Sequence, residues 1–178
     1  HEGTLYVIGL TSLSEVLAHK LAEQEGELNL SRLESLSDTV ADVLAKHRGY
    51  LGLNGLTSLS DSAAEKLVQH DGRLGLDGLT SLSDRVAETI GKHKDGLDLC
   101  GLTALSDAAA EALAKHDGVL YLSGLTTLSD HAARALSKHE GFLYLDGLTS
   151  LSDATAKALV NHPDVMLSGQ VNREGKRG

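Results

Sequence analysis

The sequence predicts an α/β solenoid, built by stacking copies of one short strand–helix unit. The chain of 178 residues has 19 Gly, one Pro and only 3% aromatic residues, which suits thin, regularly turning layers better than an irregular globular core. In each copy two leucines are separated by one residue, as on one face of a strand. Apolar residues three and four positions apart then follow, as on one face of a helix. Leucines return every 23 residues, at Leu5, Leu28, Leu51, Leu74, Leu97, Leu120 and Leu143.

The first half of each unit is predicted to be a short strand. In the third unit, Leu51 and Leu53 alternate with other residues, so both side chains lie on one face of a strand. A single unit cannot bury these leucines alone, and strand must therefore stack on strand. The pattern predicts a sheet with one strand from each unit.

The second half of each unit is predicted to be a helix. In the third unit Ser60 can cap its start, and Asp61 in the first turn complements the helix dipole. Ala64, Leu67 and Val68 then follow at helical spacing and form a narrow apolar stripe. A small residue at the position of Ala64 would let helix and sheet approach closely, and the other units also have alanine there: Ala18, Ala41, Ala87, Ala110, Ala133 and Ala156.

The end of each unit carries His-x-Gly, as at His70 and Gly72, and we expect this pair to end the helix with the glycine in a left-handed conformation. The repeat predicts one solenoid over residues 1–169, made of seven 23-residue units and a partial eighth strand that starts at Val165. Residues 170–178 are predicted to be a polar tail. Because His1 and Gly3 match the same pattern, we expect that the array continues upstream in a parent protein.

These units resemble the leucine-rich repeat, most closely its cysteine-containing subtype, which reads L-x-L-x-G-C-x-x-I-T-D before its helix. The resemblance covers about residues 1–169, although the unit is shorter than is usual for the subtype and lacks its cysteines. It implies a right-handed arc with a parallel sheet on the concave side and short helices on the convex side. It also implies protein–protein recognition on the concave sheet. The matching run of the fourth unit is Leu74-x-Leu76-x-Gly78-Leu79-x-x-Leu82-Ser83-Asp84.

Composition excludes several partners and kinds of chemistry. The net charge is −9, and no Lys/Arg cluster offsets it, so a nucleic acid is not expected as a partner. No apolar run approaches the roughly 20 residues that span a bilayer, so no membrane partner is expected. A single cysteine excludes an internal disulfide framework and leaves the compartment open, with the cytoplasm favoured. No cofactor is expected.

A row of histidines runs through the repeats, and stacking should place successive rings about 5 Å apart. Imidazoles bind transition metals, but a row offers no convergent tetrahedron of ligands. The favoured interpretation is that each ring hydrogen-bonds free carbonyls at the end of its own helix. The row consists of His47, His70, His93, His116, His139 and His162.

A row of carboxylates also recurs, at helix starts where the dipole favours negative charge. Capping is therefore preferred to calcium binding, because the glycine-rich nonapeptides of calcium-binding β-solenoids are absent. Ser, His and Asp recur mostly as such rows, and Cys100 has no unique histidine to pair with, so no enzyme, catalytic residue or metal site is expected. The carboxylates are Glu15, Asp38, Asp61, Asp84, Asp107, Asp130 and Asp153.

The candidate binding residues flank the strand leucines, where side chains point away from the core. Every aromatic residue of the chain lies there, in two patches separated by Gly75, Gly96 and Cys100. Rigid rings on one face favour recognition, although aromatic residues also favour strands for their own sake. The predicted ligand-binding residues are Tyr6, Tyr50, Asp77, Asp98, Tyr121, Phe142, Tyr144 and Asp146.

The leading functional hypothesis is a recognition module, excised from a larger repeat array, that binds a protein or peptide on the concave sheet. Because the charges of this face are mostly acidic, a basic or neutral partner is expected. The alternative is a structural spacer or a solenoid that associates end to end through its open leucine layers. A glycan held by tyrosine stacking is a third possibility.

Overall fold

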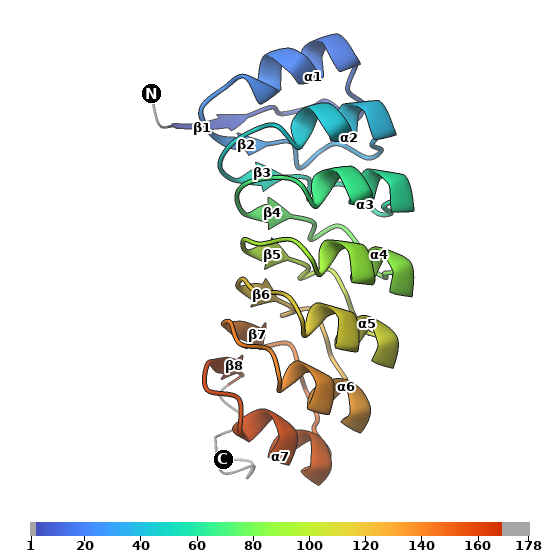
Figure 1. Ribbon diagram of the computed structural model, residues 1–178, viewed down its shortest axis with the longest axis vertical. Coiled ribbons are helices and arrows are strands. Elements are labelled where there is room, and N and C mark those ends of the chain that lie inside the picture. Colours follow the sequence, from blue (N-terminus) through green and yellow to red (C-terminus); the bar gives the residue numbers. More distant parts are fainter. Residues whose placement is uncertain (1–2, 169–178) are drawn as a thin grey trace.

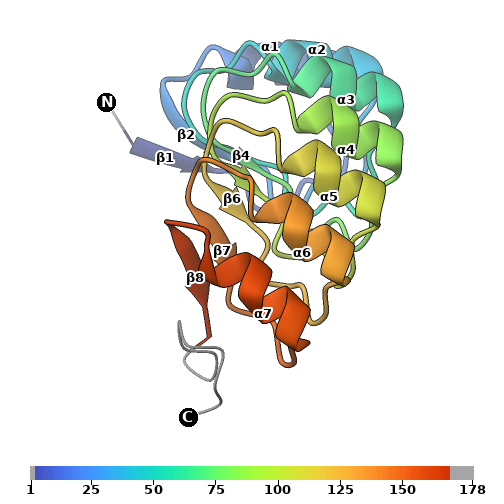
Figure 2. The ribbon, with the colours of Figure 1, turned by 60° about the horizontal axis from the view of Figure 1, so that its bottom comes forward.

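The computed structural model describes residues 3–168 and shows a curved α/β solenoid of repeated strand–helix units. Eight parallel strands form one sheet in the order β1 to β8, and seven helices alternate with them along the chain. The helices lie together along the outer side of the arc, and the sheet forms its inner side (Figure 1 and Figure 2). The parts of the predictions that concern His1, Gly169 and the tail at 170–178 lie outside the described residues.

The elements follow the 23-residue period. None of the helices in the described part of the chain is long and apolar enough to cross a membrane. The strands are β1 Gly3–Tyr6, β2 Gly26–Asn29, β3 Leu51–Gly52, β4 Leu74–Gly75, β5 Leu97–Asp98, β6 Leu120–Tyr121, β7 Leu143–Leu145 and β8 Val165–Leu167. The helices are α1 Glu15–Ala22, α2 Asp38–Leu44, α3 Asp61–Leu67, α4 Asp84–Ile90, α5 Asp107–Leu113, α6 Asp130–Leu136 and α7 Asp153–Val160.

The leucines pair with their own repeats across the sheet. Leu51 lies opposite Leu74, and Leu74 lies opposite Leu97. The predicted eighth strand is confirmed, and its early start places Val165 opposite Leu143. The inner-facing leucines form one continuous core, and one alanine from each of α1 to α6 is fully buried: Ala18, Ala41, Ala64, Ala87, Ala110 and Ala133. The layered core needs no large rings, because each thin unit is completed by its two neighbours.

Serine caps every helix, as predicted, and also links the units. In α5 the Oγ of Ser106 accepts a hydrogen bond from the Ala109 amide at 3.0 Å, and Ser106 Oγ donates to Asp84 of the preceding unit at 2.5 Å. The acidic row complements helix starts, and Asp38, Asp84, Asp107 and Asp130 also accept a hydrogen bond from the capping serine of the next unit, a contact that was not predicted. The capping residues are Ser14, Ser37, Ser60, Ser83, Ser106, Ser129 and Ser152.

The prediction that His70 and Gly72 end the helix is wrong, because the helix ends earlier in the chain. Helix α3 ends at Leu67, before either residue. Gly72 does have a positive φ of +136°, but it lies at the approach to β4, and a Cβ atom there would collide with the carbonyl oxygen of Gly49. Glycine is therefore required at this point by the close stacking of one unit on the next.

The histidine row is buried, with each of its six residues at most 4% exposed. Successive rings are stacked with their centroids 6.0–6.3 Å apart, which is wider than predicted because the rings lie outside the concave sheet, where the units of the arc spread apart. The predicted hydrogen-bond partner is also corrected: Nε2 of His70 donates to the carbonyl of Gly49 in the preceding unit at 2.9 Å, and not to a carbonyl of its own helix. His47 and His93 make the same contact with Gly26 and Gly72. Because a carbonyl only accepts, Nε2 carries the proton in these rings.

Candidate binding surface

The floor of the concave surface is made by residues with small side chains. Gly52 in β3 and Gly75 in β4 occupy the outward-facing positions between the strand leucines, and both are buried. A Cβ atom at Gly75 would collide with the hydroxyl of Tyr50, and one at Gly52 would lie 3.0 Å from its ring. The two glycines therefore let the ring of Tyr50 lie across β3 and β4.

An ion pair occupies the centre of this surface. Nε of Arg73 donates to both carboxylate oxygens of Asp98, at 2.8 and 3.0 Å. The stem of Arg73 passes over Gly96, where a Cβ atom would lie 3.3 Å from Cγ of the arginine. Asp98 is only 4% exposed, which corrects the prediction that it presents a free charge to a ligand. The cause is Arg73, which covers the carboxylate and neutralises it.

The guanidinium group of Arg73 also joins the aromatic rings. Its central carbon lies 4.4 Å from the ring centroid of Tyr121 and 5.8 Å from that of Tyr50. Tyr121 in turn stacks on Tyr144, with centroids 4.5 Å apart and ring planes 12° apart. We call Tyr50, Arg73, Tyr121 and Tyr144 the tyrosine–arginine row. The row corrects the prediction of two separate aromatic patches, because Arg73 fills the predicted gap above the glycines.

The pKa values of Asp98, Arg73 and Tyr50 are all raised. Burial raises the pKa of Asp98, while the nearby guanidinium group of Arg73 acts in the opposite direction. The hydrogen bond to Asp98 raises the pKa of Arg73, which keeps the guanidinium group protonated. Burial likewise raises the pKa of Tyr50, so its hydroxyl group stays neutral and accepts a hydrogen bond from Asn54 Nδ2 at 3.2 Å.

Arg73 keeps unused hydrogen-bonding capacity. Only Nε of Arg73 hydrogen-bonds within residues 3–168, so both terminal nitrogens remain without a partner in this part of the chain. The side chain is nearly half exposed. The orientation of the guanidinium group is fixed by Asp98 and Tyr121, so its free donors are held ready for an acceptor oxygen.

The predicted acidic residues at the rim have partners within the protein. One oxygen of Asp77 accepts a hydrogen bond from the backbone amide of Cys100 in the next unit at 2.9 Å. Asp146 is exposed and accepts a hydrogen bond from Ser123 Oγ at 3.3 Å. Asp77 thus helps to join two units as well as adding negative charge to the rim, whereas Asp146 remains accessible.

The remaining predicted aromatic residues lie apart from the row. Tyr6 is 63% exposed in β1, and Phe142 is 52% exposed just before β7. Within the described residues neither ring contacts another aromatic ring. The structure therefore brings together Tyr50, Tyr121 and Tyr144 and leaves Tyr6 and Phe142 at its two ends.

Sequence reasoning missed Arg73 as a site residue. Asp98 follows Arg73 by 25 residues, which is one repeat plus two positions, so the two residues lie diagonally across adjacent strands. The neighbouring glycines at 75 and 96 leave the space that a long side chain needs to cross the sheet. An arginine and an aspartate at diagonal positions, with glycines beside them, are the sequence pattern that could have identified Arg73.

The only thiol of this surface, that of Cys100, is not an activated nucleophile. Burial and the nearby Asp77 carboxylate raise the pKa of Cys100 to about 11, so its thiol stays protonated at neutral pH. Within residues 3–168, no group of three or more His, Cys, Asp or Glu side chains is placed to hold a metal ion. What the row presents is ring surface, hydroxyl groups and arginine donors.

A scan against protein-family models finds no match for this chain, and a search of curated proteins finds no similar sequence. The classification of the molecule therefore rests on its repeat and its fold alone. It is an α/β repeat solenoid of 23-residue strand–helix units with one parallel sheet.

Proposed function

We propose that the protein is a recognition module that binds a protein or peptide through its concave sheet. The tyrosine–arginine row carries this proposal. Its four side chains come from different repeats and hold one another on an exposed face, while the core is filled by leucine and alanine. Tyrosine and arginine fixed in this way supply contact area at little cost in side-chain entropy, as the central residues of binding interfaces do.

The charge of the row favours a partner that is uncharged where it meets Arg73 and basic where it meets the acidic edge. Arg73 neutralises Asp98, so the acidic groups that remain beside the row include Asp77 and Asp146, which hold the same repeat position and therefore lie along one edge of the sheet. The terminal nitrogens of Arg73 would donate to an uncharged acceptor such as a main-chain carbonyl. Basic side chains of the partner would then meet the rim carboxylates.

We also infer that the solenoid is of the leucine-rich-repeat type. The Leu-x-Leu-x-Gly-Leu run supports this assignment, because its glycine is required by the stacking: a Cβ atom at Gly78 would collide with the carbonyl oxygen of Asn54 in the preceding unit. The curved parallel sheet on the inner side of the arc supports it as well. Recognition on the concave sheet is the usual role of that family, which agrees with the proposed function.

The proposal is tested by selecting short random peptides displayed on phage against the wild-type protein. We expect selected peptides to lose at least about tenfold in affinity for the Tyr121→Ala/Tyr144→Ala variant, because the loss of two central contacts costs more than 1.4 kcal/mol. The control variant is Thr57→Ala/Thr80→Ala, which changes two exposed turn residues. Equal affinity for all three proteins would refute binding through the row.

A second candidate function is end-to-end self-association, which the first unit favours. Ile8 is 86% exposed and Val16 is 72% exposed, and together with the half-exposed Leu5 they give this end of the solenoid an apolar surface. Light scattering over a range of concentrations tests this alternative. Growth in mass that is abolished by Ile8→Glu/Val16→Glu would support self-association through this end, and a constant monomer mass would exclude it.

A further inference from the structure

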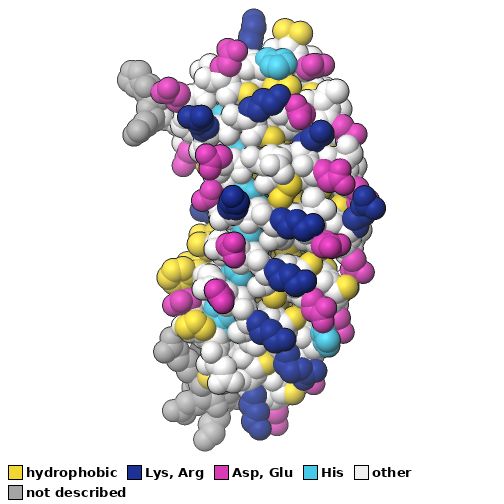
Figure 3. Space-filling model, viewed as in Figure 1, with side chains coloured by type: hydrophobic (Ala, Val, Ile, Leu, Met, Phe, Trp, Pro, Cys, Tyr) yellow, Lys and Arg dark blue, Asp and Glu magenta, His cyan; other side chains and the backbone are white. Residues whose placement is uncertain are grey.

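The His-x-Gly pairs of successive units are linked to one another along the solenoid. Nε2 of His70 donates a hydrogen bond to the carbonyl oxygen of Gly49 at 2.9 Å. Nε2 of His93 makes the same bond to Gly72, also at 2.9 Å. Figure 3 shows histidine side chains one below another along the molecule, largely covered by their neighbours. Each of these two histidines therefore holds the glycine of the preceding pair, which lies 21 residues earlier.

The bonded carbonyl groups belong to the peptides that lead into the tyrosine–arginine row. The carbonyl of Gly49 lies in one planar peptide group with the nitrogen and Cα of Tyr50. The carbonyl of Gly72 lies in the same way in one plane with Arg73. Both side chains are long, and that of Arg73 extends to Asp98 in the next unit, so a small rotation of either peptide displaces their outer atoms much farther. The two histidines thus fix the direction in which two members of the row leave the backbone.

These rings have no favourable place for a second proton. Because Nε2 donates to a carbonyl oxygen, an added proton must bind to Nδ1. In the part of the chain that the structure describes, Nδ1 of His70 and of His93 is buried without a hydrogen-bond partner. The two rings are stacked with their centroids 6.2 Å apart, so their charges would also repel one another. Burial lowers the pKa of His70, although its bond to Gly49 acts in the opposite direction. Acid therefore favours a ring that leaves its place and loses the bond to the glycine.

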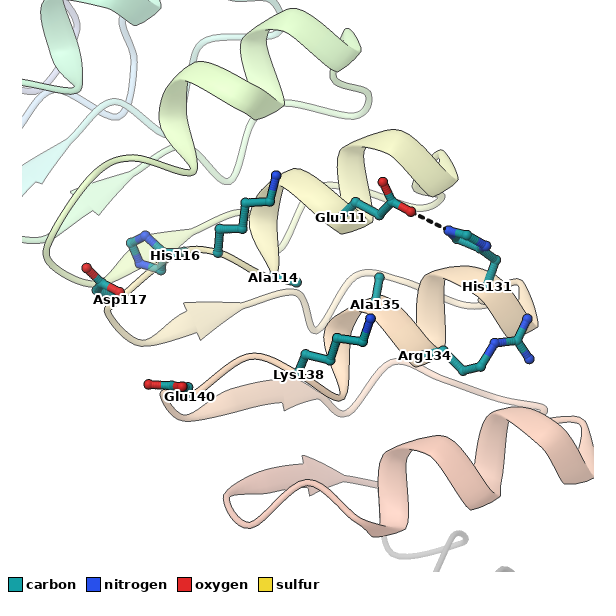
Figure 4. Close-up of a pocket in the computed structure, with 10 residues that line it drawn as sticks. Glu111, Ala114, His116, Asp117, His131, Arg134, Ala135, Lys138 and Glu140 are labelled. Carbon is teal, nitrogen blue, oxygen red and sulfur yellow. Dashed lines mark hydrogen bonds and ion pairs between the residues drawn. The ribbon is translucent and has the colours of Figure 1, made fainter.

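The charged groups around these rings do not compensate such a charge. Neither ring forms an ion pair within residues 3–168. On the sheet side, Arg73 and Asp98 pair with each other. Figure 4 shows the equivalent turn after α5, where Asp117 follows the histidine and lies at the bend of the turn. The carboxylates between the last helical turn and the next strand in these units all reach the solvent: Asp42, Glu65, Asp71, Glu88, Asp95, Glu111 and Asp117. The cations of the same segments are equally accessible: Lys46, Arg48, Lys66, Lys92, Lys94 and Lys115.

We propose that His70 and His93 are positioning residues of the concave binding surface, and that through them acid weakens the binding of a partner to the tyrosine–arginine row. This inference rests on the proposed function of that surface. At neutral pH the two histidine bonds hold the peptides before Tyr50 and Arg73. In acid the bonds are lost, and the two side chains no longer keep the orientation that recognition requires.

The chain offers a matched control for this role. His47 makes the same bond to Gly26 at 3.0 Å, but the strand that follows, β2, carries no member of the row. His162 is also buried and precedes β8, which carries none either. The variant His47→Gln/His162→Gln therefore removes two titratable rings of the same histidine row without touching the peptides that lead into the tyrosine–arginine row.

The first experiment measures the affinity of a phage-selected peptide without histidine for the full chain between pH about 7.5 and about 5.5, a range in which histidine titrates. His70→Gln/His93→Gln is compared with the wild-type protein and with the control. The amide nitrogen of glutamine can replace Nε2 as a donor but does not titrate. His70→Leu/His93→Leu removes the donors altogether, and circular dichroism checks the fold of each variant at each pH.

We expect the affinity of the wild-type protein and of the control to fall at least about fivefold toward the lower pH. The glutamine variant should bind like the wild-type protein at the higher pH and change less than about twofold on acidification. The leucine variant should bind weakly throughout. An undiminished pH dependence in the glutamine variant would overturn the proposal, because the effect would then arise from Asp98 or from the peptide. A loss of pH dependence in the control as well would overturn it by showing a general effect on stability.

A second readout separates this proposal from the proposed function. The amide signals of Tyr50 and Arg73 and the Nε–H signal of Arg73 are followed in the isotope-labelled protein over the same pH range, without peptide. They should move together with the titration of the His70 ring, and they should stay in place in the glutamine variant. If no peptide can be selected, the proposed function fails, yet these signals still decide whether the histidines position the row. Signals that do not move, or the simultaneous loss of all native signals, would contradict the positioning role.

Discussion

Replacement of Arg73 by methionine tests whether the tyrosine–arginine row is held together by its central ion pair. Methionine retains much of the apolar stem but removes the charge, so Asp98 is left buried without a cation. Breaking a fully buried pair costs about 3–5 kcal/mol, but Arg73 is nearly half exposed, and solvent screening reduces this contribution to about 1–3 kcal/mol. Loss of the contact with Tyr121 adds about 0.5–1 kcal/mol. We therefore expect Arg73→Met to lower the free energy of unfolding by about 1.5–4 kcal/mol.

The effect should depend on pH in a defined direction. Because burial raises the pKa of Asp98 in the folded state, the folded protein binds this proton more tightly than the unfolded chain does. The contribution of Asp98 to stability is therefore fully present at low pH and is lost as pH rises through its folded pKa. Removal of Arg73 increases that loss, so the destabilisation by Arg73→Met should be largest at neutral pH and should shrink on acidification.

Urea unfolding followed by far-UV circular dichroism measures these differences, each taken against the wild-type protein at the same pH. The control is Arg85→Met, which removes an exposed ion pair and should cost less than about 1 kcal/mol with little pH dependence. Asp98→Asn in the Arg73→Met background should recover part of the lost stability. The reasoning is refuted if Arg73→Met costs no more than Arg85→Met, or if Asp98→Asn has the same effect in both backgrounds.

Three further predictions concern the repeat architecture. Burial lowers the pKa of His70, His116, His139 and His162. Their stabilising contribution is therefore present above the ordinary histidine pKa of about 6.5 and is lost as pH falls below it. A melting temperature that stays constant on mild acidification would contradict this. Gly101→Ala should destabilise by about 1–3 kcal/mol in urea unfolding, because its Cβ would collide with the backbone carbonyl of Asp77, whereas Gly3→Ala meets no atom within 4 Å and should be nearly neutral. With its pKa raised from 9.0 to about 11, the thiol of Cys100 should react with iodoacetamide roughly a hundredfold more slowly in the native protein than in urea, and equal rates would contradict its burial.

The repeat made most of the fold predictable from the sequence. Each unit meets the same neighbours, so the spacing of Leu51 and Leu74 determines both the order of the strands and their register. The serine caps and the buried alanines follow from local chemistry and from helical spacing. The partner of His70 was mistaken because its hydrogen bond crosses to Gly49 in the preceding unit, and the spacing within a single unit does not reveal that distance.

The candidate site was only partly predictable. Alternation along the strands identified the exposed face and its tyrosines correctly. The burial of Asp98 was missed, because it depends on a diagonal contact with Arg73 that exists only where two glycines leave the sheet uncovered. Exposure of a side chain is determined by its neighbours on adjacent strands, and alternation along one strand does not describe them.

The most direct test of recognition through the concave sheet is to map a phage-selected peptide on the protein by amide chemical shifts. Titration into the isotope-labelled protein should shift amides of β3 to β7, with the largest changes near Arg73 and Tyr121, and should leave the helices almost unchanged. Shifts confined to the helical side or to the first unit would contradict the proposal that the tyrosine–arginine row is the binding surface.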